Sequence, residues 1–102
     1  MAKASDSYYE EFLYPRLRDT DLAVEYLNAS LEEGRPESFL TALGHVAQAH
    51  GIGMSDLAKK TQLNRKNLYT VLSENGNPEW KSLNTLLEAL GFGLQVKAKR
   101  VA

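Results

Sequence analysis

The sequence predicts a mainly α-helical fold that ends in one β-strand. Along most of its 102 residues, apolar side chains recur every three or four positions, which is the spacing of one helix face. Residues 92–101 instead alternate apolar and polar side chains, which is the period of a half-buried strand. Two short helical patterns follow each other in residues 54–73, so we expect the five predicted helices to include a helix-turn-helix.

The first predicted helix follows an ambiguous aromatic segment. Residues 8–17 (YYEEFLYPRL) fit either a short helix broken near Pro15 or an extended segment that lies on the core. Asp19 is then a helix N-cap, because its carboxylate can accept hydrogen bonds from the first free amides. The helix runs through Leu31 and stops at Gly34. Its expected buried stripe consists of Leu22, Ala23, Tyr26, Leu27 and Leu31.

Two longer helices supply most of the remaining core. Pro36 suits the first turn of a helix that runs to about His50 and ends at Gly51. The last predicted helix runs from about Trp80 to Leu90. The positions that these two helices are expected to bury are Phe39, Leu40, Leu43, Val46, Ala47, Trp80, Leu83, Leu86, Leu87 and Leu90.

The helix-turn-helix is predicted between these two helices. Its first helix covers residues 54–62, its turn residues 63–64 and its second helix residues 65–73. Asn64 can cap the second helix through its side-chain oxygen. The inward positions of the pair, which are expected to join the core, are Leu57, Ala58, Thr61, Leu68, Val71 and Leu72.

A solitary C-terminal strand needs a partner, because its backbone amides and carbonyls would otherwise remain unpaired. Three partners are possible: the same strand of a second subunit, a strand of another protein, or residues 8–14 folded back. The remaining alternative is a frayed tail that has no partner. The expected contact residues are Phe92, Leu94 and Val96.

Composition excludes several classes of function. The chain has no cysteine, which rules out disulfides, thiolate catalysis and cysteine-based zinc sites. His45 and His50 lie five positions apart, so they do not form the metal pair that faces one side of a helix. We therefore expect no enzyme, metal, cofactor or small-molecule substrate. No apolar run is long enough to span a bilayer and residues 1–12 do not resemble a signal peptide, so we expect a cytoplasmic protein without a membrane partner.

Charge is distributed unevenly along the chain. Residues 1–38 carry nine acids and four bases, a net charge of −5, whereas residues 39–102 carry four acids and eight bases, a net charge of +4. The overall charge of −1 and a pI near 6.1 argue against a protein that coats DNA without regard to sequence. An acidic front and a basic back suggest two surfaces with different partners.

The basic helices point to sequence-specific recognition of double-stranded DNA. A helix fits the major groove, and side chains of its first turns reach the base edges. Arg65 is the best candidate, because its guanidinium can donate to two acceptors of one guanine. The full set of expected base contacts is Arg65, Lys66, Tyr69 and Thr70. The expected phosphate contacts are Ser55, Lys59, Lys60, Asn64, Asn67, Asn75, Asn77 and Lys81.

These segments resemble a known family. The run MSDLAKKTQLNRKNLYTVLSENGNP, the leucines after it and the closing FGLQV resemble the Cro/cI-type helix-turn-helix. More narrowly, LNRKNLY, the GNP turn and AVEYLN are similar to the probable addiction-module antidote family, antitoxins akin to HigA. The resemblance covers about residues 8–96. Members tend to carry Gly where this chain has Gln62 and Ser where it has Asn64, and both replacements still allow the turn and the cap.

The resemblance implies a five-helix, lambda-repressor-like fold with an N-terminal helical extension. The helix-turn-helix domain would occupy residues 36–91. An acidic N-terminal extension with one helix would occupy residues 1–35, and a C-terminal strand or tail residues 92–102. The protein would be an antitoxin of a type II toxin–antitoxin module that neutralises a RelE/ParE-like toxin and represses its own operon. We expect a homodimer on an inverted-repeat operator, because one small helix-turn-helix buries too little surface for tight specific binding.

Two other functions stay open. A stand-alone repressor would bind DNA without a toxin partner, and a protein-interaction module would keep the fold without binding DNA. The acidic front could meet a basic RelE-like toxin electrostatically through Glu10, Glu11, Asp19, Asp21, Glu25 and Glu32, and the C-terminal strand is the competing toxin contact.

Overall fold

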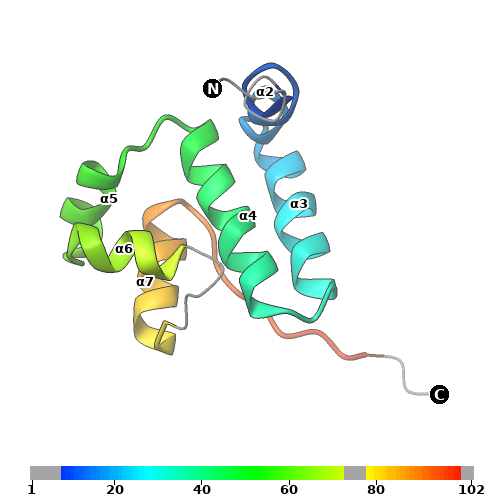
Figure 1. Ribbon diagram of the computed structural model, residues 1–102. Helices are drawn as coiled ribbons and strands as arrows, with labels where there is room; N and C mark the ends of the chain where they lie inside the picture. The colour runs from blue at the N-terminus through cyan, green and yellow to red at the C-terminus, as the bar shows by residue number, and fades with distance from the viewer. Residues whose placement is uncertain (1–7, 73–77, 100–102) are drawn as a thin grey trace.

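The computed structural model describes residues 8–72 and 78–99, and these residues are mainly helical (Figure 1). A short π-helix leads into the first α-helix, and the α-helices then follow one another along the chain. The bounds are η1 (Tyr9–Leu13), α2 (Tyr14–Leu17), α3 (Thr20–Glu32), α4 (Pro36–Ala49), α5 (Met54–Thr61), α6 (Arg65–Val71) and α7 (Trp80–Ala89).

The aromatic segment at the front is helical, which decides between the two conformations that the sequence allowed. Pro15 lies in the first turn of α2, directly after η1. Leu17 ends this helix and is 2% exposed. The segment therefore anchors on the core through α2, which packs against both α3 and α4.

Helix boundaries follow the capping residues. The Asp19 carboxylate accepts hydrogen bonds from the amides of Asp21 (2.9 Å) and Leu22 (3.2 Å), which confirms it as the N-cap of α3. Gly34 ends that helix region with a φ of 78°, a conformation that glycine adopts without steric cost. Pro36 opens α4, as its fixed φ favours.

Helix α4 lies at the centre of the molecule, between α3 on one side and α5–α7 on the other (Figure 1). Its apolar residues are buried as predicted, and Leu43 and Val46 have no exposed surface. A single hydrophobic core includes residues of every α-helix. Its innermost members from the other helices are Leu17, Ala23, Leu57, Leu68, Leu86 and Leu87.

Three of the residues predicted to be buried are exposed. Trp80 is 66% exposed, Leu31 45% and Leu22 40%. Helix α3 instead buries Ala23, Leu27 and Ser30, so its inner face is rotated relative to the predicted stripe. Periodicity identifies apolar positions, but which face a neighbouring helix covers depends on tertiary packing.

The predicted C-terminal strand is not seen in its described part, residues 92–99, which we call the C-terminal arm. The arm begins with a hydrogen bond from the Phe92 amide to the Leu87 carbonyl (2.8 Å) and runs past α3, where Lys97 lies 4.0 Å from Glu32. The idea that residues 8–14 fold back as its partner is wrong, because that segment is helical. A strand needs a second extended segment, and the described residues contain none.

The N-terminal helices are tied to α4 by polar contacts. The Arg18 Nε donates to the Ala49 carbonyl (3.0 Å) and so satisfies one of the free carbonyls at the end of α4. The Tyr26 hydroxyl and His45 Nδ1 are 2.7 Å apart. Burial lowers the pKa of His45, and burial together with the nearby Tyr9 and Tyr8 raises the pKa of Tyr26. The predicted single helix of the extension is thus part of a larger helical contact with α4.

Candidate nucleic-acid interface

The turn after α5 is held by Gln62 and Thr61. Gln62 has a φ of 61°, the left-handed conformation that ends many helices and that glycine adopts most easily. The buried Thr61 hydroxyl donates to the Leu57 carbonyl (2.7 Å) and accepts from the Leu63 amide (3.2 Å). Thr61 was predicted only as an inward position, and its side chain also fixes the direction in which the chain leaves α5.

Asn64 caps the second helix, as the sequence predicts. Its side-chain oxygen accepts a hydrogen bond from the Lys66 amide (2.8 Å), and its backbone carbonyl accepts the first helical bond, from the Leu68 amide (3.0 Å). The cap orients the start of α6, which begins at Arg65, directly after Asn64. The side-chain oxygen of Asn64 therefore serves the helix itself, and a contact to phosphate would need its side-chain NH₂ group as the donor.

The two helices pack through the residues that the sequence assigns to the core. Leu57 of α5 and Leu68 of α6 are completely buried, and Ala58, Val71 and Leu72 are partly buried against the same core. Helix α5 contacts both α6 and α7. The pair is thus attached rigidly to the body of the protein, and its remaining side chains are left for the surface.

The outer surface of this region is basic. Lys59 and Lys60 lie in the last turn of α5, Lys66 in the first turn of α6 and Lys81 in the first turn of α7, and all four are exposed. Within residues 8–72 and 78–99, none of these lysines forms an ion pair. Four cations that form no ion pair attract a polyanion more strongly than paired ones would.

A groove of about 300 Å³ lies between the turn and the start of α7, and Lys81 lines it. The groove is lined by Thr61, Gln62 and Leu63 on one side and by Lys81, Ser82 and Thr85 on the other. Ser82 and Thr85 were not among the predicted site residues. The signal that could have found them is the polar face that residues 81, 82 and 85 share at the start of a helix.

Two smaller polar residues complete the described surface. Ser55 is exposed in the first turn of α5, where free amides favour an anion, although the adjacent exposed Asp56 opposes one. Thr70 is exposed on α6, and its hydroxyl donates to the Lys66 carbonyl (3.2 Å).

The remaining predicted site residues lie partly or wholly outside the part of the chain that the structure describes. Arg65, Asn67 and Tyr69 belong to α6 by their backbone, but their side chains lie outside the description. Asn75 and Asn77, with most of the predicted turn after α6, lie outside the described residues. Lys66 and Thr70, which lie four positions apart, therefore mark the outward side of α6.

The acidic residues lie on the opposite side of α4. Helices η1 to α3 carry the exposed Glu10, Glu11, Asp19, Asp21, Glu25 and Glu32, whereas the basic group lies on α5–α7 (Figure 1). The charge asymmetry of the sequence is thus an asymmetry of the surface. One side favours anionic partners and the other does not.

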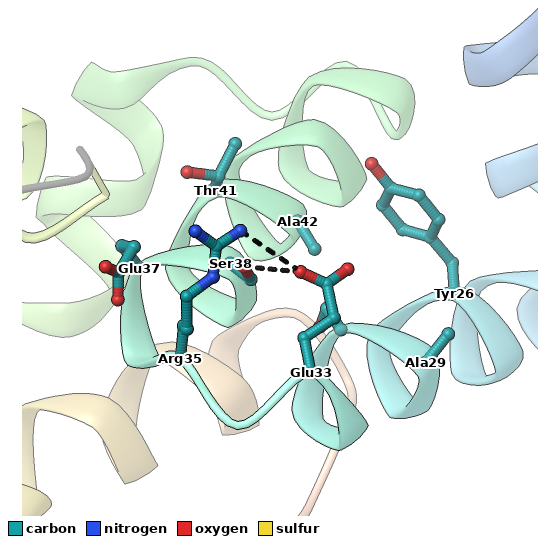
Figure 2. A pocket seen from close by; sticks show the side chains of 9 residues that line it. Tyr26, Ala29, Glu33, Arg35, Glu37, Ser38, Thr41 and Ala42 are labelled. Carbon is teal, nitrogen blue, oxygen red and sulfur yellow. Dashed lines mark hydrogen bonds and ion pairs between the residues drawn. The ribbon is translucent and has the colours of Figure 1, made fainter.

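A second hollow of about 350 Å³ lies between α3 and α4 on the acidic side (Figure 2). Glu33 accepts a hydrogen bond from the Ser38 hydroxyl (2.7 Å) and lies 3.5 Å from Arg35. These contacts close the turn between the two helices. Glu33, Arg35 and Ser38 thus satisfy one another, and Glu37 is the other charged residue that lines the hollow.

Among residues 8–72 and 78–99, no group of three or more histidine, aspartate or glutamate side chains is arranged to hold a metal ion. None of the helices in these ranges combines the length and the apolar character needed to cross a membrane.

Comparison with known proteins gives two matches. A family model described as "probable addiction module antidote protein" matches residues 10–98. An uncharacterized protein of Haemophilus influenzae is 38% identical over 77 residues, which are 76% of this chain and 77% of that protein. No solved structure matches the chain.

Proposed function

This chain belongs to the family of probable addiction module antidote proteins, and on that premise we propose that it is the DNA-binding antitoxin of a type II toxin–antitoxin module. Membership implies a toxin as partner, and the family is not an enzyme family. In our proposal the toxin is RelE/ParE-like, the antitoxin represses its own operon, and both act in the cytoplasm.

The observation that carries the DNA proposal is the exposed basic surface on α5, α6 and α7. We propose that α5 and α6 are a helix-turn-helix of the lambda-repressor-like kind. The cap by Asn64, the left-handed Gln62 and the shared burial of Leu57 and Leu68 support this assignment. A short helix that begins at a sharp turn and presents basic side chains can enter the major groove.

The proposed contacts divide into two groups. Arg65, Lys66, Tyr69 and Thr70 would contact base edges, and Arg65 would donate to two acceptors of one guanine. Ser55, Lys59, Lys60, Asn64, Asn67, Asn75, Asn77 and Lys81 would contact phosphates. The groove between the turn and α7 supports the phosphate assignment of Lys81 and adds Ser82 and Thr85 as donors near it.

A homodimer is part of the proposal. Two copies would bind the halves of an inverted repeat, since a single small domain buries too little surface for tight specific binding. Phe92, Leu94 and Val96 of the arm are the proposed contact residues. Leu94 and Val96 are exposed in the single chain.

The toxin would bind either to the acidic side or to the arm. Co-expression with the neighbouring reading frame, using chains that lack residues 1–34 or 92–102, separates these surfaces. Loss of neutralisation in one truncation identifies the toxin contact, provided that the truncated chain still folds by circular dichroism. Full neutralisation by both truncations would refute both assignments.

DNA binding is tested by mobility-shift titration on the DNA upstream of the gene, at two salt concentrations. We expect retardation that weakens steeply as salt increases, because phosphate contacts release counterions. The absence of retardation at any protein concentration would favour an interaction module that does not bind DNA. Retardation without a neutralised neighbouring toxin would favour a stand-alone repressor.

A further inference from the structure

The outer face of α3 carries a stripe that no contact in the single chain covers fully. Helical spacing aligns Asp21, Val24, Asn28, Leu31 and Glu32 on this face, which we call the outer stripe. Val24 is 40% exposed and Leu31 45%. The buried residues of α3, Ala23, Leu27 and Ser30, lie on the other side of the helix. Apolar residues at the centre of the stripe and acids at its ends are typical of a protein contact.

The C-terminal arm borders this stripe. A groove of about 380 Å³ separates them, lined on α3 by Val24, Asn28, Leu31 and Glu32 and on the arm by Gly93, Leu94, Gln95 and Lys97. Leu94 is 38% exposed, and Val96 is 97% exposed. A valine almost wholly in water costs free energy that a partner could recover.

The backbone of the arm is also unsatisfied by the rest of the chain. In the described residues, the arm's backbone hydrogen bond is that of the Phe92 amide, and residues 93–99 make none to other backbone groups. An extended segment with free amides and carbonyls is a template for pairing with another chain. The groove and the open edge lie at the same place.

We propose that the arm of a second copy of this chain fills the groove. It pairs antiparallel with the first arm and packs over the outer stripe of α3. This inference rests on the homodimer of the proposed function and adds the second half of its contact, which lies on α3. A two-fold axis brings each arm onto the stripe of the other copy, so one groove and one arm per chain satisfy both.

Side-chain chemistry selects the register. With Val96 opposite Val96 at the axis, Leu94 lies opposite Ala98 and Lys97 opposite Gln95. This register pairs apolar residues with one another and keeps lysines from facing each other, which would be destabilising. It also places every residue from 93 to 99 opposite a residue of the other arm, so that alternate residues exchange backbone hydrogen bonds.

Charge identifies a second copy as the occupant. Within one chain, Lys97 lies 4.0 Å from Glu32 at the C-terminal end of α3. An antiparallel arm runs the other way, so its Lys99, which lies opposite Gly93 in this register, approaches the part of α3 around Val24, where Asp21 and Glu25 are exposed. The basic arm and the acidic stripe thus complement each other between copies as well as within one.

The test measures the mass of the purified full chain by size-exclusion chromatography with light scattering. We expect twice the chain mass of 11.4 kDa for the wild type. Val24→Asp should raise the dissociation constant of the dimer roughly 100-fold or more, because a carboxylate would be buried in an apolar contact. Leu22→Asp is the matched control, since Leu22 is also 40% exposed on α3 but does not line the groove; it should remain dimeric.

A cross-link tests the register without risk to folding. The chain has no cysteine, so Val96→Cys introduces a single thiol at a residue that is 97% exposed. We expect this variant to form a disulfide-linked dimer on mild oxidation, and Lys99→Cys to do so much more slowly. Equal rates for the two variants would overturn the register.

Other outcomes overturn the inference itself. A wild-type chain that runs as a monomer, or a dimer that Val24→Asp and Val96→Asp leave intact, would refute the groove as the dimer contact. A chain that dimerises through its arms but does not retard its upstream DNA would leave the inference standing and refute the proposed DNA function. A chain that retards DNA as a dimer, and whose dimer Val24→Asp leaves intact, would refute the inference and leave the proposed DNA function standing.

Discussion

The two sides of α4 use their apolar residues in opposite ways. In the α5–α6 pair, Leu57 and Leu68 are completely buried and the exposed side chains include Lys59, Lys60 and Lys66. On the α3 side, Val24 and Leu31 of the helix and Leu94 and Val96 of the arm remain exposed among acids. The first of these surfaces buries Leu57 and Leu68 within one chain and carries charge for a polyanion. The second is incomplete within one chain and is suited to another protein surface.

The largest expected effect separates the two sides by stability. Leu57→Ala should lower the free energy of unfolding by about 2–5 kcal/mol, because it leaves a cavity in the core beneath α5. Leu22→Ala, on the partly exposed face of α3, should cost about 1 kcal/mol or less. Urea denaturation followed by circular dichroism measures both. Equal costs would show that the two faces are buried to a similar extent.

Arg65→Ala tests the specificity of the basic side. By the usual value of a two-donor contact to guanine, the variant should lose roughly 1–3 kcal/mol of DNA-binding free energy. It should also discriminate less at one base pair of the operator. Binding titrations against a set of single-base operator variants measure this, and a loss spread evenly over all positions would instead make Arg65 a phosphate contact.

On each side of α4, one helix is capped by a side-chain oxygen of the residue before it. Asn64→Ala removes the cap of α6 and Asp19→Ala removes the cap of α3, and each should cost about 1 kcal/mol of stability. Only Asn64→Ala should also weaken DNA binding, because it loosens the start of α6. If both caps proved equally important for DNA binding, the acidic side would have to contribute to it.

The smallest expected effect concerns the left-handed residue of the turn. Gln62 has a φ of 61°, so Gln62→Gly removes steric strain and should stabilise the chain by about 0.5–1 kcal/mol. Thermal unfolding at fixed protein concentration detects this gain. A loss of stability would mean that the Gln62 side chain makes contacts that outweigh the strain.

The helices could be predicted from the sequence because their signals are local. Asp19, Gly34, Pro36 and Asn64 mark helix ends by their own chemistry, and apolar spacing identifies the core of α4. The conformation of the arm could not, because a strand needs a second extended segment beside it and an alternating pattern does not say whether there is one. Trp80, Leu22 and Leu31 were misassigned for a related reason, since spacing does not say which apolar face is covered.

The candidate site was likewise predictable where its signals are local and not where it depends on packing. Residue types on α5 and α6 were sufficient to select Lys59, Lys60 and Lys66, which the structure leaves exposed. The groove that brings Lys81 to the turn depends on how α7 packs against α5, which local patterns do not encode. The Tyr26–His45 contact was missed because its two residues lie 19 positions apart on separate helices.

We propose that DNA binds to the α5–α6 side of the molecule and not to the α3 side. The most direct measurement is the salt dependence of affinity for the upstream DNA, compared among wild type, Lys60→Ala and Glu25→Gln. Loss of one phosphate contact should lower the slope of log K against log salt by about 1 in Lys60→Ala, whereas Glu25→Gln should leave it unchanged. An unchanged slope in Lys60→Ala, with a changed slope in Glu25→Gln, would contradict the account.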